Sequence, residues 1–181
     1  MNNNLKKLIL TALFIALCFI GGHLKIMGSI AFDALPAFIG TLILGWHWGA
    51  VIGALAHMLS ALLSAFPLTL PVHLITAVIM AITMIAFYFT FCGVKKTKLP
   101  SVVAYILASI VAVIFNCPIA LLCTAPLLSM PVAVSLIPIL LPASIANVVL
   151  AVVIYSALPK NIKNIENKTT KTNSNAQNYK T

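Results

Sequence analysis

Two histidines and several hydroxyl residues lie close together in a strongly apolar stretch, HMLSALLSAFPLTLPVH, which begins at His57 and ends at His73. Ser60 and Ser64 follow His57 after three and seven residues, which places all three near one face of a helix. Their side chains offer hydrogen-bond donors and acceptors without a fixed charge. Because a polar group inside hydrocarbon costs free energy, this pattern indicates a binding site for a small molecule within a membrane span.

Further residues could complete the same site if the helices close into a bundle. Those for hydrogen bonds are Thr76, Asn116 and Asn147, those for stacking are Phe66 and Trp48, and those for ordering a loop over the ligand are Asp33 and Lys25. This set suits a neutral, flat, hydroxyl-bearing ligand better than an ion. The alternative is that the histidines and serines bond to main-chain carbonyls and only hold helices together.

Catalysis and metal binding find little support in the sequence. Asp33 and Glu166 are the only acidic residues, and Glu166 lies in the polar C-terminal segment. His57 and His73 lack a nearby third ligand of the kind that zinc requires. We therefore expect no enzyme, metal or cofactor, and a membrane-embedded enzyme that depends on Asp33 remains a weaker alternative.

The composition places these residues in a membrane protein. Hydrophobic residues make up 62% of the 181-residue chain and charged residues only 7%, whereas soluble domains carry about 25% charged residues. We expect an all-α integral membrane bundle in the plasma membrane of a bacterium, surrounded by lipid. Nucleic acid is not an expected partner, because the lysines are not interleaved with aromatic residues.

The apolar runs predict six transmembrane helices within residues 1–158, the second of them short and buried by its neighbours. Six crossings place ten of the eleven lysines on one side, so the positive-inside rule predicts that both termini are cytoplasmic. Residues 21–33, 66–72 and 118–130 then lie at the outer face. Residues 159–181, rich in lysine, asparagine and threonine, are predicted to form a disordered cytoplasmic tail. The predicted spans are residues 5–22, 34–44, 48–65, 71–92, 100–117 and 131–158.

Small residues recur every fourth position in several spans, which favours close helix packing in lipid. Gly45, Gly49 and Gly53 form one such row, and we expect it to pack inside the bundle. Ala12 and Ala16 form another row in the first span. Their spacing alone leaves open whether their partner is internal or another protein.

The run FDALPAFIGTLILGWHWGAVIGALAHMLSALLSAFPLTLPVHLITAVIMA, preceded by LKKLILTALFIAL, resembles the substrate-binding S components of energy-coupling factor (ECF) vitamin transporters. The resemblance covers residues 5–158. It implies that Ala12 and Ala16, which match the AxxxA motif of the family's first helix, dock onto a transmembrane coupling subunit served by two ATPase subunits.

The resemblance is strongest to the branch proposed to take up α-ribazole, a neutral cobalamin precursor with a flat base and a ribose. It implies capture of the ligand at the outer face and its release inside the cell. S components share a fold while differing in substrate, so other vitamins such as riboflavin or cobalamin stay open. A ligand-free membrane interaction or assembly subunit remains the alternative from a different class.

Overall fold

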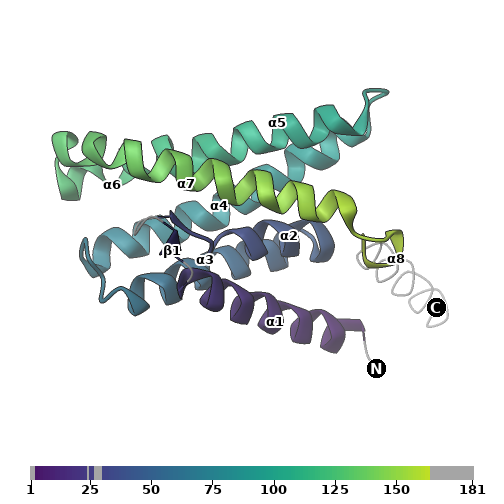
Figure 1. Ribbon diagram of the computed structural model, residues 1–181, viewed down its shortest axis with the longest axis horizontal. Coiled ribbons are helices and arrows are strands. Elements are labelled where there is room, and N and C mark those ends of the chain that lie inside the picture. Colours follow the sequence, from purple (N-terminus) through teal and green to yellow (C-terminus); the bar gives the residue numbers. More distant parts are fainter. Residues whose placement is uncertain (1–2, 24, 27–29, 164–181) are drawn as a thin grey trace, which may run out of the picture.

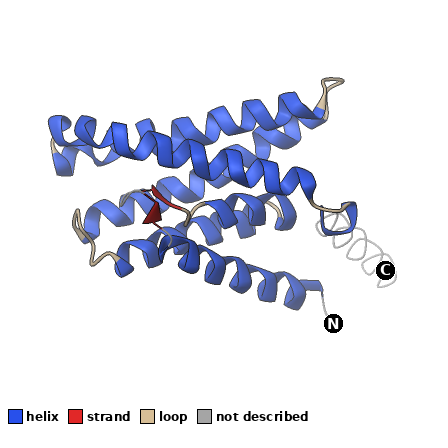
Figure 2. Cartoon of the chain, viewed as in Figure 1, coloured by secondary structure: helices blue, strands red, loops and turns tan. Residues whose placement is uncertain are grey.

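The chain folds into a bundle of helices, which confirms the predicted all-α class (Figures 1 and 2). The structure is a computed structural model that describes residues 3–23, 25–26 and 30–163. A pair of two-residue strands is the exception in this part of the chain, with Lys25 opposite Ala31. The elements are α1 (Asn3–His23), β1 (Lys25–Ile26), β2 (Ile30–Ala31), α2 (Leu35–Leu44), α3 (Trp46–Leu63), α4 (Leu70–Lys95), α5 (Ser101–Ile114), the π-helical turn η1 (Phe115–Ile119), α6 (Ala120–Leu128), α7 (Met130–Ala157) and α8 (Lys160–Lys163).

Five helical segments in the described part of the chain are long and apolar enough to cross a membrane. The short helix expected at residues 34–44 is α2, which has ten residues and is almost completely buried. At 1.5 Å per residue it measures about 15 Å, half of the roughly 30 Å hydrocarbon core. Helix α2 is therefore too short to cross a bilayer by itself. The five long segments are Asn4–His23, Trp46–Leu63, Leu70–Lys95, Ser101–Leu128 and Met130–Ala157.

The fifth predicted span is wrong at its C-terminal end. It was expected to stop at Cys117, but it runs on through η1 and α6 to Leu128. Residues 118–128 are therefore helical, whereas the sequence left open whether residues 118–130 form a loop or a half-helix. Pro118 suggested a boundary because proline lacks an N–H and clashes with the preceding turn. The chain accommodates Pro118 in a π-helical turn instead, a feature that is frequent at functional sites.

Helix α2 lies in the middle of the bundle, where it packs against α1, α3, α4 and α7. Its side chains fill the core, and the ring of Phe38 meets that of Phe87 edge-on at 5.1 Å between centroids. Helix α1 packs against α2, α3 and β2 along one side, and its other side is exposed. On the far side of the bundle from α1 lies α5 (Figure 1).

The rows of small residues bring the helices together, as expected for the glycines. Gly49 faces the side chain of Thr41 on α2, and Gly53 faces Met84 on α4. Ala104, Ala108 and Ala112 are completely buried along α5. Close packing through these rows replaces the hydrophobic driving force that is lacking between helices in lipid.

Replacing Gly49 with alanine is expected to destabilise the protein by about 1–3 kcal/mol, the usual cost of overpacking. The added methyl group would collide with the side chain of Thr41. Gly93→Ala is the matched control, because an added Cβ there meets nothing within 4 Å, and alanine has the higher helix propensity. Thermal unfolding of the purified variants tests this. Equal midpoints for Gly49→Ala and Gly93→Ala would contradict the packing.

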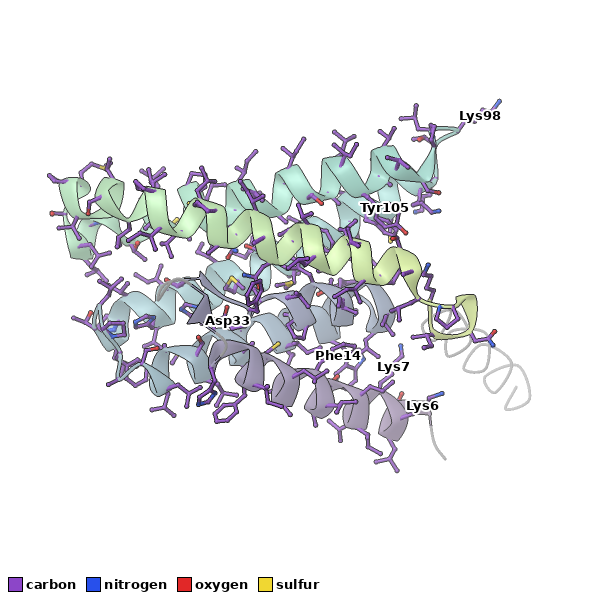
Figure 3. The ribbon with its side chains drawn as sticks, in the orientation of Figure 1. Lys6, Lys7, Phe14, Asp33, Lys98 and Tyr105 are labelled. Atoms are coloured by element: carbon purple, nitrogen blue, oxygen red, sulfur yellow. The ribbon has the colours of Figure 1, made fainter. Side chains whose placement is uncertain are left out.

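Lysines gather at one end of the bundle. Lys6, Lys7 and Lys98 lie at this end in Figure 3, where Asp33 is placed away from them. The α6–α7 connection lies at the opposite end (Figure 1). Residues 160–163 of the predicted tail form one helical turn, α8, and residues 164–181 lie outside the described residues.

Candidate functional site

A cavity of about 220 Å³ lies at the N-terminal end of α2. It forms because α2 has ten residues whereas the neighbouring α3, α4 and α7 have 18 to 28, so the middle of the bundle is unfilled beyond the start of α2. The lining of the cavity includes Leu68, between α3 and α4, and Leu128, at the end of α6. One side of the cavity therefore lies at the end of the bundle opposite the lysines (Figure 1). The polar residues in its wall are Asp33, His57, His73, Thr76, Asn116, Thr124, Ser144 and Asn147.

The two histidines form a pair across α3 and α4. His73 Nδ1 and His57 Nε2 are 3.3 Å apart, so one ring donates a hydrogen bond to the other. His73 is 7% exposed, and its Nε2 atom is buried with no hydrogen-bond partner among the described residues. Leaving a buried polar atom unsatisfied costs about 1–3 kcal/mol. Phe66 packs against the same imidazole, with ring centroids 5.7 Å apart.

The asparagines fix the wall of the cavity that α7 contributes. The backbone N–H of Leu35 donates to Asn147 Oδ1 at 2.8 Å, so Asn147 caps the first turn of α2. Asn147 Nδ2 donates to the carbonyl of Ala143 at 2.9 Å. Asn116, carried on η1, donates to Ser144 Oγ at 3.0 Å. These bonds tie α2 and η1 to α7, so both asparagines hold helices in place as well as facing the cavity.

Two threonines present oxygen lone pairs to the cavity. Thr76 donates its hydroxyl proton to the carbonyl of Val72 at 2.9 Å. Thr124 donates to the carbonyl of Ala120 or Leu121, at 3.0 and 3.1 Å. Because both protons are used within the helices, each hydroxyl oxygen faces the cavity as an acceptor. Such groups favour a ligand that donates hydrogen bonds.

The charge of the cavity wall comes from Asp33, which stands just before the N-cap residue of α2. A carboxylate at a helix N-terminus is favoured by the helix dipole. Lysine is absent from the wall of the cavity in the described chain. Among the described side chains, the site therefore offers no counter-charge to an anionic ligand.

Of the eleven predicted contact residues, six line the cavity, four do not, and one has a side chain outside the described residues. Ser60 lies beside Gly22 of α1, and Ser64 caps the end of α3. Trp48 packs on the main core, nine residues before His57 on α3. Phe66 touches His73 from outside the lining, and the side chain of Lys25 lies outside the described residues. The six that line the cavity are Asp33, His57, His73, Thr76, Asn116 and Asn147.

Sequence reasoning missed Thr124 and Ser144. Ser144 lies three residues before Asn147, a spacing that shares a helix face and could have been noticed. Thr124 was overlooked because residues 118–130 were expected to lie at the outer face between spans. Among the described residues, no group of three histidine, cysteine, aspartate or glutamate side chains could hold a metal ion, and the cysteines described are free.

Residues 6–161 match the family described as ECF transporter, substrate-specific component. The chain belongs to this family. No match was found among curated proteins or among solved structures. The family match covers all the helices that build the cavity.

As an S component, the chain is a transport subunit and not an enzyme. S components bind a vitamin and work with a transmembrane coupling subunit and ATPase subunits. The family and the long apolar helices together make this a multi-pass membrane protein. Ala12 and Ala16 are both exposed on the side of α1 that faces away from α2 and α3.

Proposed function

We propose that this S component captures a small, neutral, hydroxyl-bearing vitamin or vitamin precursor in the cavity at the N-terminal end of α2. The observation that carries the proposal is His73, which is buried, paired with His57 and has no partner for its Nε2 atom among the described residues. A buried polar atom of this kind calls for an explanation. A ligand that forms a hydrogen bond with His73 supplies one.

The pairing of the two rings favours a hydroxyl group on the ligand. If His73 Nδ1 donates to His57, then His73 Nε2 is an acceptor. If His57 donates instead, then His73 Nε2 carries a proton and donates. A hydroxyl group on the ligand can form a hydrogen bond with His73 Nε2 in either case, because a hydroxyl both donates and accepts. Thr76 and Thr124 add acceptors for further ligand hydroxyls.

The charge of the site favours a neutral ligand over an anionic one. A carboxylate or phosphate on the ligand would face Asp33, and no lysine among the described side chains of the wall would balance it. In a low-dielectric site such a charge is costly to bury unless it is paired. We therefore expect vitamins that carry carboxylate or phosphate groups to bind poorly.

The size of the cavity favours a compact ligand. Its volume of about 220 Å³ is below the roughly 300–1,000 Å³ that is usual for ligand pockets. Cobalamin, with its corrin macrocycle, is a poor fit. α-Ribazole, with one flat base and one ribose, is our first candidate, and riboflavin is the second.

The lysine-rich end suggests how the protein is oriented. Lys6, Lys7 and Lys98 share one end of the bundle (Figure 3), and the positive-inside rule places such an end in the cytoplasm. The cavity reaches the other end and would then receive its ligand from outside the cell. We propose that α2 completes a sixth crossing together with the hairpin before it. Ala12 and Ala16 would dock on the coupling subunit.

Mass spectrometry of small molecules released from the detergent-purified protein tests the proposed function. We expect a neutral hydroxylated ligand, and we expect added α-ribazole to raise the melting temperature more than carboxylated vitamins do. A protein without ligand, and without a melting shift across a panel of neutral vitamins, would favour the assembly-subunit alternative. A shift with anionic vitamins alone would contradict the charge argument.

A further inference from the structure

A second hollow lies on the opposite side of the molecule from α1, between α5 and α7. It is a groove of about 490 Å³, and isoleucine and valine make up eight of its ten lining residues. Along α5 it extends from Tyr105 to Ile114, which is about 14 Å of helix. β-Branched side chains have restricted rotamers, so the walls keep their shape. The vitamin cavity and this groove share no lining residue.

Both walls of the groove lead to a lysine at the same end. On α5, Tyr105 is one turn from Ser101, whose hydroxyl accepts a hydrogen bond from Lys95 Nζ at 2.8 Å. On α7, Val153 is three residues from Ser156, whose carbonyl accepts from Lys163 Nζ at 2.7 Å. An ammonium group has three donors, and each of these bonds uses one of them.

Aromatic rings mark this end of the groove as the level of a membrane interface. The rings of Tyr105 and Tyr155 lie 6.3 Å apart, and Phe91 lies 5.1 Å from Tyr105. Lys163 Nζ lies 5.3 Å from the centre of the Tyr155 ring. Tyrosine is enriched where headgroups meet hydrocarbon. Asp33, the only acidic residue in the described part of the chain, lies far from Tyr105 (Figure 3).

We propose that this groove is a binding site for an anionic phospholipid. One acyl chain lies between α5 and α7, and the phosphate is bound by the amines of Lys95 and Lys163. An anionic phospholipid matches both features of the site, because it joins a hydrocarbon chain to a negative group at the depth of the interface. A zwitterionic phospholipid offers the same chain without net charge and is bound less well.

Lipid retention by the full-length protein tests this site. Protein in detergent is mixed with phosphatidylglycerol and phosphatidylcholine in equal amounts, and native mass spectrometry counts the bound lipid. We expect phosphatidylglycerol to be preferred by the wild type. Lys95→Gln and Lys163→Gln should each lower the preference about five-fold, since a lysine near an anionic surface contributes about that factor. Ile110→Trp, which fills the groove, should lower retention of both lipids.

Matched controls separate this site from general attraction to a basic protein. Lys6→Gln with Lys7→Gln removes two charges from α1, on the other side of the bundle (Figure 1). Ile9→Trp adds an indole ring to an exposed position of α1. Both controls should keep the wild-type preference. The proposal is overturned if they lose as much as the groove variants do. It is also overturned if Ile110→Trp retains lipid normally but loses the coupling subunit, because the groove would then hold a protein partner. Elution as a single species shows that each variant is folded.

Discussion

Replacing His73 with leucine is expected to weaken ligand binding by about 10- to 100-fold, the cost of losing one buried hydrogen bond to the ligand. His73 is 7% exposed, and its Nε2 atom is unpartnered among the described residues. Equilibrium binding of α-ribazole to the purified protein measures the effect. His57→Leu should also weaken binding, because it removes the partner that orients His73. The two losses should not add, since the rings act as one unit.

His47→Leu is the control for the histidine variants. His47 is exposed near the start of α3, and its ring is stacked on Trp46. The cavity does not include it, so its loss should leave binding unchanged. Wild-type affinity in His73→Leu would contradict the role given to the histidine pair. Equal losses in His73→Leu and His47→Leu would point to a general effect on the fold.

Placing tryptophan at both Ala12 and Ala16 is expected to reduce vitamin uptake by cells more than ten-fold while leaving ligand binding intact. Small residues let two helix backbones approach closely in lipid, and an indole ring holds them apart. Both alanines are exposed and α1 lies at the edge of the bundle, so the isolated protein should tolerate the change. Uptake of labelled α-ribazole, and co-purification with the coupling subunit, measure the effect.

Val78→Trp is the control for the docking variant. Val78 is 60% exposed on α4, so its indole ring faces lipid just as the new rings on α1 do. We expect it to keep both uptake and binding. Normal uptake by the Ala12→Trp, Ala16→Trp double variant would show that this row does not dock. Loss of ligand binding in the same variant would show that the change disturbs the cavity.

The helices could be predicted from the sequence largely because lipid restricts the backbone. A chain in hydrocarbon must pair its own N–H and C=O groups, so long apolar runs become helices. The same constraint explains the error after Cys117. Pro118 looks like a boundary in a soluble protein, but in this chain the helix continues through a π-helical turn. The turn places Asn116 on the cavity wall.

The site could be predicted only in part because helix phase alone does not say which neighbour a residue faces. His57 and Ser60 are three residues apart, yet His57 faces α4 and Ser60 faces Gly22 on α1. Helix α3 packs against both α1 and α4, so residues close together on its inward face contact two different helices. The capping of α2 by Asn147 joins residues 112 positions apart and has no local signal in the sequence.

The most direct test of the account is nitrogen NMR of the histidine side chains during titration with α-ribazole. The chain has four histidines, and two of them, His57 and His73, line the cavity. His23 and His47 are exposed elsewhere and serve as internal references. We predict that the signals of His57 and His73 shift to saturation at one ligand per chain while those of His23 and His47 stay fixed. Saturable binding that leaves the signals of His57 and His73 unchanged would contradict the account.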